Sequence, residues 1–132
     1  MKLSKESEYA LEGLIFLARQ PRGTVMPLNK IARAQRLPQG FLAKIFQKFV
    51  QHGLVTSYRG RQRGYALAKL PAAIPLKAIL DSVEGPDLFD RCIFWNSRCA
   101  DGDPCRLHDR WKEIKPRLLR MVERTSLKDL VS

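Results

Sequence analysis

Acidic residues are missing from about half of this 132-residue chain. No Asp or Glu lies between Gly13 and Leu80, a stretch with twelve Lys or Arg, whereas the rest of the chain carries twelve basic and thirteen acidic residues. The net charge of +11 therefore comes from this one stretch. Such a cationic field attracts nucleic acid, an acidic protein or an anionic membrane surface. Because the chain has neither a lipid-anchor signal nor a basic amphipathic tail, we expect nucleic acid to be its partner.

Long apolar runs are also absent. No run approaches the eighteen residues that a membrane-spanning helix needs, and the opening residues MKLSKESEYALEGL contain three glutamates, unlike a signal peptide. The three cysteines are an odd number, which fits poorly with a secreted disulfide framework. These absences predict a cytoplasmic protein with no membrane partner. Because the chain has no cofactor fingerprint and no nucleophile–base pair at a recognisable spacing, we do not expect an enzyme.

The N-terminal half shows apolar residues at helical spacing. Helices are predicted over residues 7–20 and 28–36, and a third begins at Pro38, which suits a first helical position, and is closed by Gly53. Two short strands are then predicted, over residues 54–58 and 65–68, around a turn bounded by glycines. Three helices followed by a basic hairpin are the order of a winged helix-turn-helix, in which the third helix enters the major groove of DNA.

The turn of the predicted hairpin carries three arginines, Arg59, Arg61 and Arg63. Glycines beside them allow the backbone to approach a ligand closely, and arginine enters a narrow minor groove, where the potential of DNA is most negative. A solvated surface turn is the alternative interpretation. The preceding helices favour a DNA-binding wing.

The composition changes after Leu70. A helix is predicted over residues 74–83, and a polar loop with all the cysteines follows it. The last helix, over residues 107–125, carries an apolar stripe that suits pairing with a second copy, although Pro116 should kink or weaken it. The predicted fold class is mainly α with a small β-hairpin wing. Residues 1–70 are predicted to be the DNA-binding domain, and residues 71–132 the cysteine loop and a long dimerisation helix.

Cys92, Cys99 and Cys105 lie within fourteen residues, and His108 follows three residues after the last of them. Thiolates this close in sequence can converge on a metal centre. Zinc usually takes shorter spacings between its cysteines, so the wider gaps favour an iron–sulfur cluster. Three alternatives stay open: unrelated thiols, a redox disulfide and a zinc site.

Three parts of the chain together resemble the Rrf2 superfamily of winged-helix bacterial transcription regulators, which includes IscR, NsrR and RirA. They are MKLSKESEYAL at the start, FLAKIFQKFVQHGLVTSYRG in the middle and the three cysteines before the last helix. The resemblance covers nearly the whole chain. It implies a homodimer that binds operator DNA and senses redox state, nitric oxide or iron status through an iron–sulfur cluster.

The resemblance also implies where DNA is contacted, namely the start of the third helix and an Arg-Gly pair in the wing. In this chain the helix residues are Pro38, Gln39, Gly40, Phe41, Ala43 and Lys44, and the wing pair is Arg59 and Gly60. We add Lys48 on the polar face of the same helix, and Arg61 and Arg63 in the wing. In the family a pair of glycines usually continues the wing, whereas Gln62, Arg63 and Gly64 fill the loop here.

For a cluster, the resemblance implies Cys92, Cys99 and Cys105 as thiolate ligands and leaves the fourth ligand open. Members similar to IscR use a histidine three residues after the last cysteine and hold a 2Fe–2S cluster, and His108 stands there. Members similar to NsrR use an acidic residue in the first helix and hold a 4Fe–4S cluster, and Glu8 stands there. We prefer His108, since imidazole is the commoner ligand. A regulator of the same fold switched by thiol oxidation or a small ligand is the alternative.

Overall fold

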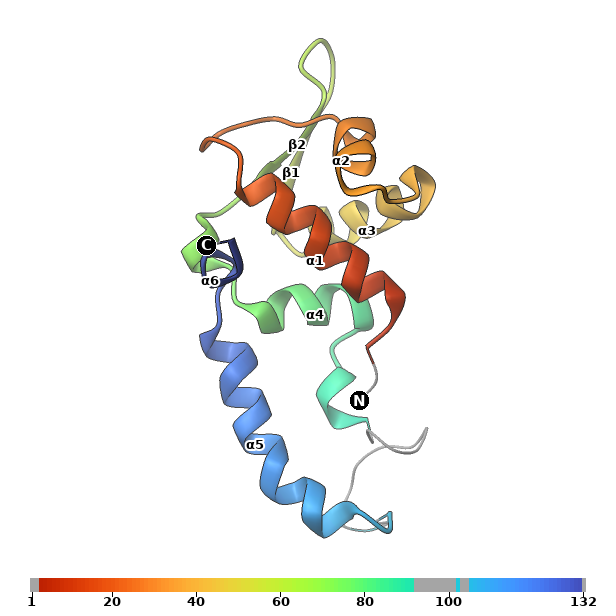
Figure 1. Ribbon diagram of the computed structural model, residues 1–132, viewed down its shortest axis with the longest axis vertical. Helices are drawn as coiled ribbons and strands as arrows, with labels where there is room; N and C mark the ends of the chain where they lie inside the picture. Colours follow the sequence, from red (N-terminus) through yellow and green to blue (C-terminus); the bar gives the residue numbers. More distant parts are fainter. Residues whose placement is uncertain (1–2, 92–101, 103–104, 132) are drawn as a thin grey trace.

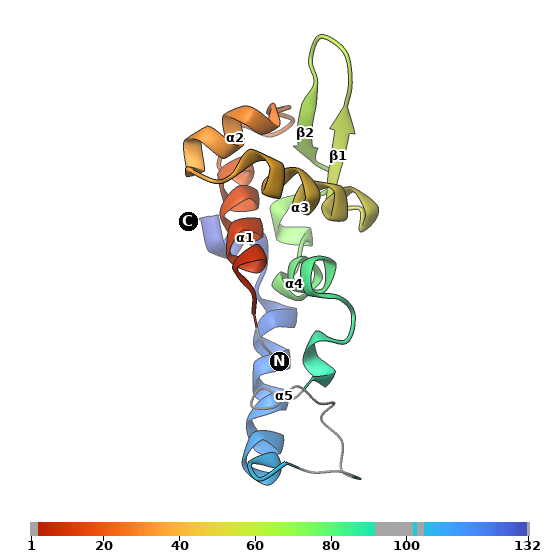
Figure 2. The ribbon, with the colours of Figure 1, turned by 90° about the vertical axis from the view of Figure 1, so that its right-hand side faces the viewer.

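The computed structural model describes residues 3–91, 102 and 105–131 of the chain. It is mainly helical, with one two-stranded hairpin that projects at one end, while a long helix extends at the opposite end (Figures 1 and 2). The elements in chain order are α1 (Lys5–Ala18), α2 (Leu28–Gln35), α3 (Gln39–Gln51), β1 (Val55–Tyr58), β2 (Gly64–Leu67), the short 3-10 turn η1 (Pro71–Ala73), α4 (Leu76–Glu84), a second 3-10 turn η2 (Leu88–Asp90), α5 (His108–Arg124) and α6 (Leu127–Val131).

The main hydrophobic core lies where α1 packs against α2, α3 and α4 (Figure 1). Its largest fully buried side chains from α1 and α3 are Leu14, Phe46 and Phe49. The ring of Phe46 lies 5.3 Å from that of Phe49 and 5.0 Å from that of Tyr65 on β2, centroid to centroid. Gly13 permits this close packing, because a Cβ there would lie 3.0 Å from Phe46 Cε2. One aromatic side chain therefore joins α1, α3 and the hairpin.

The helix-turn-helix agrees with the sequence prediction, with small shifts at the helix ends. Helix α3 begins at Gln39, and Pro38 caps it with an extended backbone instead of occupying its first turn. The turn before it depends on Arg36, whose φ of 55° is in the left-handed region and ends α2. Helix α1 begins at Lys5 and ends at Ala18, so it lies two residues earlier than predicted at both ends.

Strand β2 is also joined to the loop between α1 and α2. In the hairpin Val55 pairs with Leu67 and Tyr58 with Gly64. On the other side of β2, the N–H groups of Met26 and Tyr65 each donate to the carbonyl oxygen of the other residue at 2.9 Å. This extra bridge holds β2 beside the start of α2.

The C-terminal part of the chain first leaves the main core and then returns to it. Helices α4 and α5 enclose a second, smaller core of Leu80, Leu88, Phe89 and Val122. Helix α6 then docks on α1 and η1, where Leu127 is fully buried in the main core. Its backbone N–H donates to Ile74 O at 2.8 Å, and Leu76 N–H donates to Thr125 O at 2.7 Å. The end of α5 is thus fixed to the start of α4.

The apolar stripe predicted along the last helix divides between two faces. Trp111 and Val122 are buried against the protein, whereas Ile114 and Met121 are 54% and 48% exposed. The helix is continuous from His108 to Arg124, although Pro116 lies inside it. No helix in the described part of the chain has the length and apolarity needed to cross a membrane.

Gly64 is the position where a side chain would do most damage to the wing. Its φ is +147°, and an added Cβ would meet the carbonyl group of Met26. We expect Gly64→Ala to lower the free energy of unfolding by about 2 kcal/mol. Gly40→Ala is the matched control, because nothing lies within 4 Å of a Cβ there, so it should be neutral or slightly stabilising. Chemical denaturation measures both variants, and a Gly64→Ala protein as stable as the wild type would contradict this account.

Candidate functional site

A groove of about 740 Å³ separates the wing from the starts of α2 and α3. The residues that line it are Pro27, Leu28, Asn29, Gln39, Tyr58, Arg61, Arg63, Gly64 and Tyr65. Two of these residues are arginines and none is acidic. The groove therefore connects the first turn of α3, the helix predicted to read DNA, with the arginines of the hairpin. The charged residues that line it are both positive, which favours an anionic ligand.

The start of α3 is open to solvent. Pro38, Gln39, Gly40 and Lys44 are exposed, and Ala43 is half-buried. Phe41 has a different setting, although it is 42% exposed, because its ring packs edge-on against Tyr9 at 5.6 Å between centroids. Phe41 thus braces the start of α3 on α1. The surface left for a ligand consists of small and polar side chains, which suits the floor of a major groove.

The wing places all its predicted contact residues at its exposed end. Arg59, Gly60, Arg61 and Arg63 are all exposed, and Gly60 has a φ of +92°, which suits glycine at the tip of the turn. Tyr58, at the end of β1, is 47% exposed and lines the groove beside two of the arginines. Our sequence reasoning missed Tyr58 and also Asn29. The signal for Tyr58 was a large aromatic residue directly before the basic turn.

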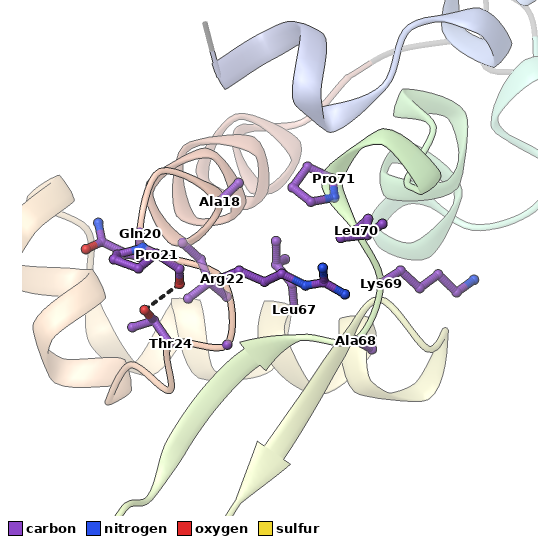
Figure 3. A pocket seen from close by; sticks show the side chains of 12 residues that line it. Ala18, Gln20, Pro21, Arg22, Thr24, Leu67, Ala68, Lys69, Leu70 and Pro71 are labelled. Atoms are coloured by element: carbon purple, nitrogen blue, oxygen red, sulfur yellow. Dashed lines mark hydrogen bonds between the residues drawn. The ribbon is translucent and has the colours of Figure 1, made fainter.

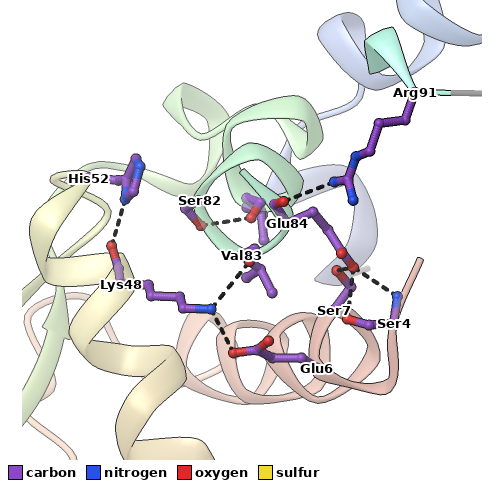
Figure 4. A network of polar contacts seen from close by, with 10 residues as sticks. Ser4, Glu6, Ser7, Lys48, His52, Ser82, Val83, Glu84 and Arg91 are labelled. Carbon is purple, nitrogen blue, oxygen red and sulfur yellow. Dashed lines mark hydrogen bonds and ion pairs between the residues drawn. The ribbon is translucent and has the colours of Figure 1, made fainter. Parts of the chain in front are cut away.

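Lys48 lies apart from these residues. Its Nζ is 2.9 Å from Glu6 Oε1 on α1 and donates to Val83 O on α4 at 3.3 Å (Figure 4). The sequence predicted a DNA contact from its position on the polar side of the helix. The structure places its ammonium group between three helices.

A cluster of polar groups surrounds Glu84 at the end of α4, next to this ion pair (Figure 4). One Glu84 carboxylate oxygen accepts hydrogen bonds from Ser4 N–H and Ser4 Oγ, each at 2.8 Å, and from Ser7 Oγ. Arg91 donates to the Glu84 backbone oxygen at 2.9 Å. Burial alone would raise the pKa of Glu84, but the hydrogen bonds from Ser4 and Ser7 and the charge of Arg91 together lower it below its usual value.

The predicted cluster ligands fall partly outside the described residues, because Cys92 and Cys99 are not among them. Cys105 is half-buried just before α5, and His108 is only 7% exposed at the first position of that helix. His108 N–H donates to Cys105 O at 3.1 Å, so both residues belong to one turn. Across residues 3–91, 102 and 105–131, no three His, Cys, Asp or Glu side chains are grouped so that they could hold a metal ion.

Glu8, the other predicted ligand, lies on the exposed side of α1. Its Oε2 is 3.0 Å from Lys5 Nζ, and both side chains are more than half exposed. The hydrogen bond to Glu8 and its charge raise the pKa of Lys5. Exposed pairs of this kind contribute little to stability, so this carboxylate is available to another partner.

A second cavity of about 430 Å³ lies behind the wing (Figure 3). Its walls come from the end of α1, the following loop, the end of β2 and the segment that leads into η1. Leu17, Leu67 and Leu70 give it apolar surface, and Arg22 and Lys69 are its charged residues. In Figure 3 the Arg22 side chain reaches across the cavity, whereas Lys69 points away from it.

The comparisons with known proteins agree with this architecture. The model of the Rrf2 family, described as iron-dependent transcriptional regulators, matches residues 3–132. The transcriptional regulator IscR of Yersinia enterocolitica is 28% identical to this chain, over all of the chain and 80% of IscR.

Two solved structures share the fold. CymR, the global cysteine regulator of B. subtilis, is 26% identical and superimposes with a TM-score of 0.82, covering 99% of this chain and 96% of CymR. The oxidized form of Staphylococcus aureus CymR is 24% identical, with a TM-score of 0.77, covering 100% of this chain and 97% of that one, a likeness of fold alone. The predicted winged helix-turn-helix is thereby confirmed.

The exposed wing arginines lead to a direct test. We expect Arg59→Ala to weaken binding to duplex DNA and to reduce the slope of log K against log salt concentration by about 0.9, the share of one phosphate contact. Arg120→Ala, an exposed position on α5 away from the groove, is the control and should leave the slope unchanged. A fluorescence titration over a series of salt concentrations measures both slopes. Equal slopes for Arg59→Ala and the wild type would count against a wing that contacts the DNA backbone.

Proposed function

We propose that this chain, which belongs to the Rrf2 family of DNA-binding transcriptional regulators, binds operator DNA as a homodimer under the control of an iron–sulfur cluster. One observation carries the proposal. All three cysteines of the chain lie within fourteen residues of sequence, from Cys92 to Cys105, shortly before α5, and the hairpin end of the protein presents a basic wing and an open helix start.

The DNA-binding part is proposed to be residues 1–70, with the start of α3 in the major groove and the wing on the backbone or in the minor groove. Pro38, Gln39, Gly40, Ala43 and Lys44 would face the base edges or nearby phosphates. Arg59, Gly60, Arg61 and Arg63 would follow the adjacent strand. The groove between α3 and the wing supports this assignment, because it joins both elements and carries no acidic lining residue.

The sensing part is proposed to be residues 71–132, with Cys92, Cys99 and Cys105 as thiolate ligands and His108 as the fourth ligand. Thiolate and imidazole are ligands that iron–sulfur clusters accept. The nearly buried imidazole of His108, in one turn with Cys105, supports this choice, and Glu8 is the alternative. A bound cluster would supply a group that oxygen, nitric oxide or iron loss can destroy.

A switch without a cluster is the second candidate. Two observations favour it, the similarity to CymR, a cysteine regulator, and the cavity behind the wing. In this version the cysteines would respond to oxidation directly, or a small anionic molecule with an apolar body would occupy the cavity beside Arg22. Either event would act on the same DNA-binding part.

The cluster proposal is tested by anaerobic purification from iron-replete cells, followed by absorbance spectroscopy and assays of iron and sulfide. We expect about two irons and two sulfides per chain, with several resolved visible bands, if His108 is the fourth ligand. About four irons and one broad band would favour Glu8 instead.

Variants sharpen this test. Cys99→Ala should abolish the visible absorbance and leave a folded protein, and His108→Ala should change the bands, whereas His52→Ala is the matched histidine control and should keep them. A colourless, iron-free wild-type protein would overturn the cluster and leave the thiol or ligand switch.

The homodimer is proposed to form through the exposed apolar face of α5, where Ile114 and Met121 lie seven residues apart on one side of the helix. Burying each in a partner is worth about 2 kcal/mol. The double substitution Ile114→Ser and Met121→Ser should therefore shift the protein from twice the chain mass toward the single chain mass in sedimentation equilibrium. Glu123→Ser on another face of α5 is the control. A double variant that stays as dimeric as the wild type would place the interface elsewhere.

A further inference from the structure

Lys48 joins three helices through one ammonium group. It lies on α3, its Nζ is 2.9 Å from Glu6 Oε1 on α1, and it donates to Val83 O in the last turn of α4 at 3.3 Å. The side chain of Glu6 is 26% exposed and that of Lys48 is 37% exposed, so the ion pair is partly shielded from water. A carbonyl in the last turn of a helix has no partner within that helix, and a lysine is a favourable donor to it.

The contact is directional, unlike the rest of the packing of α3. The buried face of this helix consists of Leu42, Ile45, Phe46 and Phe49. Apolar contacts of this kind hold a helix in place but resist small rotations weakly, whereas a charged hydrogen bond depends on the positions of both atoms. Lys48 therefore fixes α3 relative to the end of α4 in a way that the core alone does not.

The next residue of α4 holds the start of α1 in the same manner. Glu84 accepts hydrogen bonds from Ser4 N–H and from the hydroxyl groups of Ser4 and Ser7, so it takes the place of a capping side chain at the start of α1. Ser7 is only 2% exposed. Val83 and Glu84 are adjacent, so α1 and α3 are both fixed to one short piece of backbone at the end of α4 (Figure 4).

This piece of backbone also meets the residue that precedes Cys92. The Arg91 guanidinium donates to the backbone oxygen of Glu84 at 2.9 Å and lies 3.8 Å from Asp87 Oδ1. A displacement of Arg91 therefore acts on the same residues that position α1 and α3.

We propose that Lys48 and Glu84 are positioning residues, which make the orientation of α3 on DNA depend on the end of α4. Through Arg91, this orientation would also depend on the state of the cysteine segment, by which we mean residues 92–105. In this proposal the ammonium group of Lys48 is held by Glu6 and Val83 and does not touch DNA. The dependence on the cysteine segment rests on the function proposed above. The positioning of α3 does not rest on it.

The first test uses the full-length protein, reduced and free of metal, with a DNA duplex selected from random sequences by the wild-type protein. We expect Lys48→Met to lower the affinity about tenfold and to leave the slope against log salt unchanged. Lys48→Arg should restore most of the affinity, because it keeps the charge and the donors. Lys44→Met, an exposed lysine on the same helix, should instead reduce the slope by about 0.9.

The slope separates the two roles of a lysine. If Lys48→Met also reduces the slope by about 0.9, the ammonium group contacts a phosphate and the proposal is wrong. An unchanged affinity would overturn it as well. Circular dichroism checks that each variant is folded, and Glu6→Gln, which removes the same ion pair from the α1 side, replaces Lys48→Met if that variant does not fold.

The second test asks whether Lys48 and Glu84 act together. Since both fix their helices to one piece of backbone, the double variant Lys48→Met and Glu84→Gln should bind no more weakly than the weaker single variant. Glu12→Gln, at an exposed position of α1, is the control and should combine additively with Lys48→Met. Additive losses for Lys48 and Glu84 would show two independent effects and overturn the proposal.

The regulatory step is tested by comparing the DNA affinities of the cluster-loaded and metal-free proteins. Glu84→Gln should bring their ratio close to one while leaving the absorbance of the loaded protein unchanged. A ratio in Glu84→Gln equal to that of the wild type would remove the link to the cysteine segment. A wild type that takes up no cluster would overturn the proposed function, whereas the metal-free results would still decide the positioning role.

Discussion

The burial of Phe46 is the interaction on which the arrangement of the DNA-binding surface depends. Its ring touches Phe49 and Tyr65, and Gly13 leaves room for it on α1. Complete burial of a phenylalanine side chain stabilises a fold by about 2 kcal/mol. Phe46 contributes this free energy where α1, α3 and β2 meet. The start of α3 and the wing can form one groove because Phe46 of α3 packs against Tyr65 of β2.

The absence of acidic residues between Gly13 and Leu80 has a structural consequence as well as a functional one. Within that stretch no arginine or lysine can pair with a carboxylate of the stretch itself, so any ion pair that it makes takes a partner from outside the stretch. The wing arginines are exposed. Lys48 forms an ion pair with Glu6, and Lys77 forms one with Asp81 at 2.6 Å. The same composition that makes the surface cationic therefore directs its few internal ion pairs toward α1 and the end of α4.

The sequence predicted the helices, the hairpin and the winged architecture well, because the helices have apolar faces at the right period and a proline directly precedes α2, α3 and α4. Most of the residues that it predicted as DNA contacts on α3 and the wing are exposed, while the contacts themselves stay a prediction. It did not predict the contacts of Lys48 with α1 and α4, because the apolar period of one helix does not show which other helices approach its polar side. Tyr58 and the division of the α5 stripe were missed on similar grounds. Burial at Val122 depends on where α4 and η2 lie, and that is a tertiary property.

The cysteine segment begins and ends at anchored residues, which explains how a change within it could reach the DNA-binding part. At one end Arg91 is bonded to Glu84. At the other, His108 begins α5, and α6, which follows it, returns the chain to the main core through Leu127. Between these anchors, α4 and α5 share the small second core around Leu80 and Val122, and the hydrogen bond from Leu76 N–H to Thr125 O joins the start of α4 to the end of α5. In the proposed switch, a displacement of Arg91 would be passed to the end of α4, where α1 and α3 are both held.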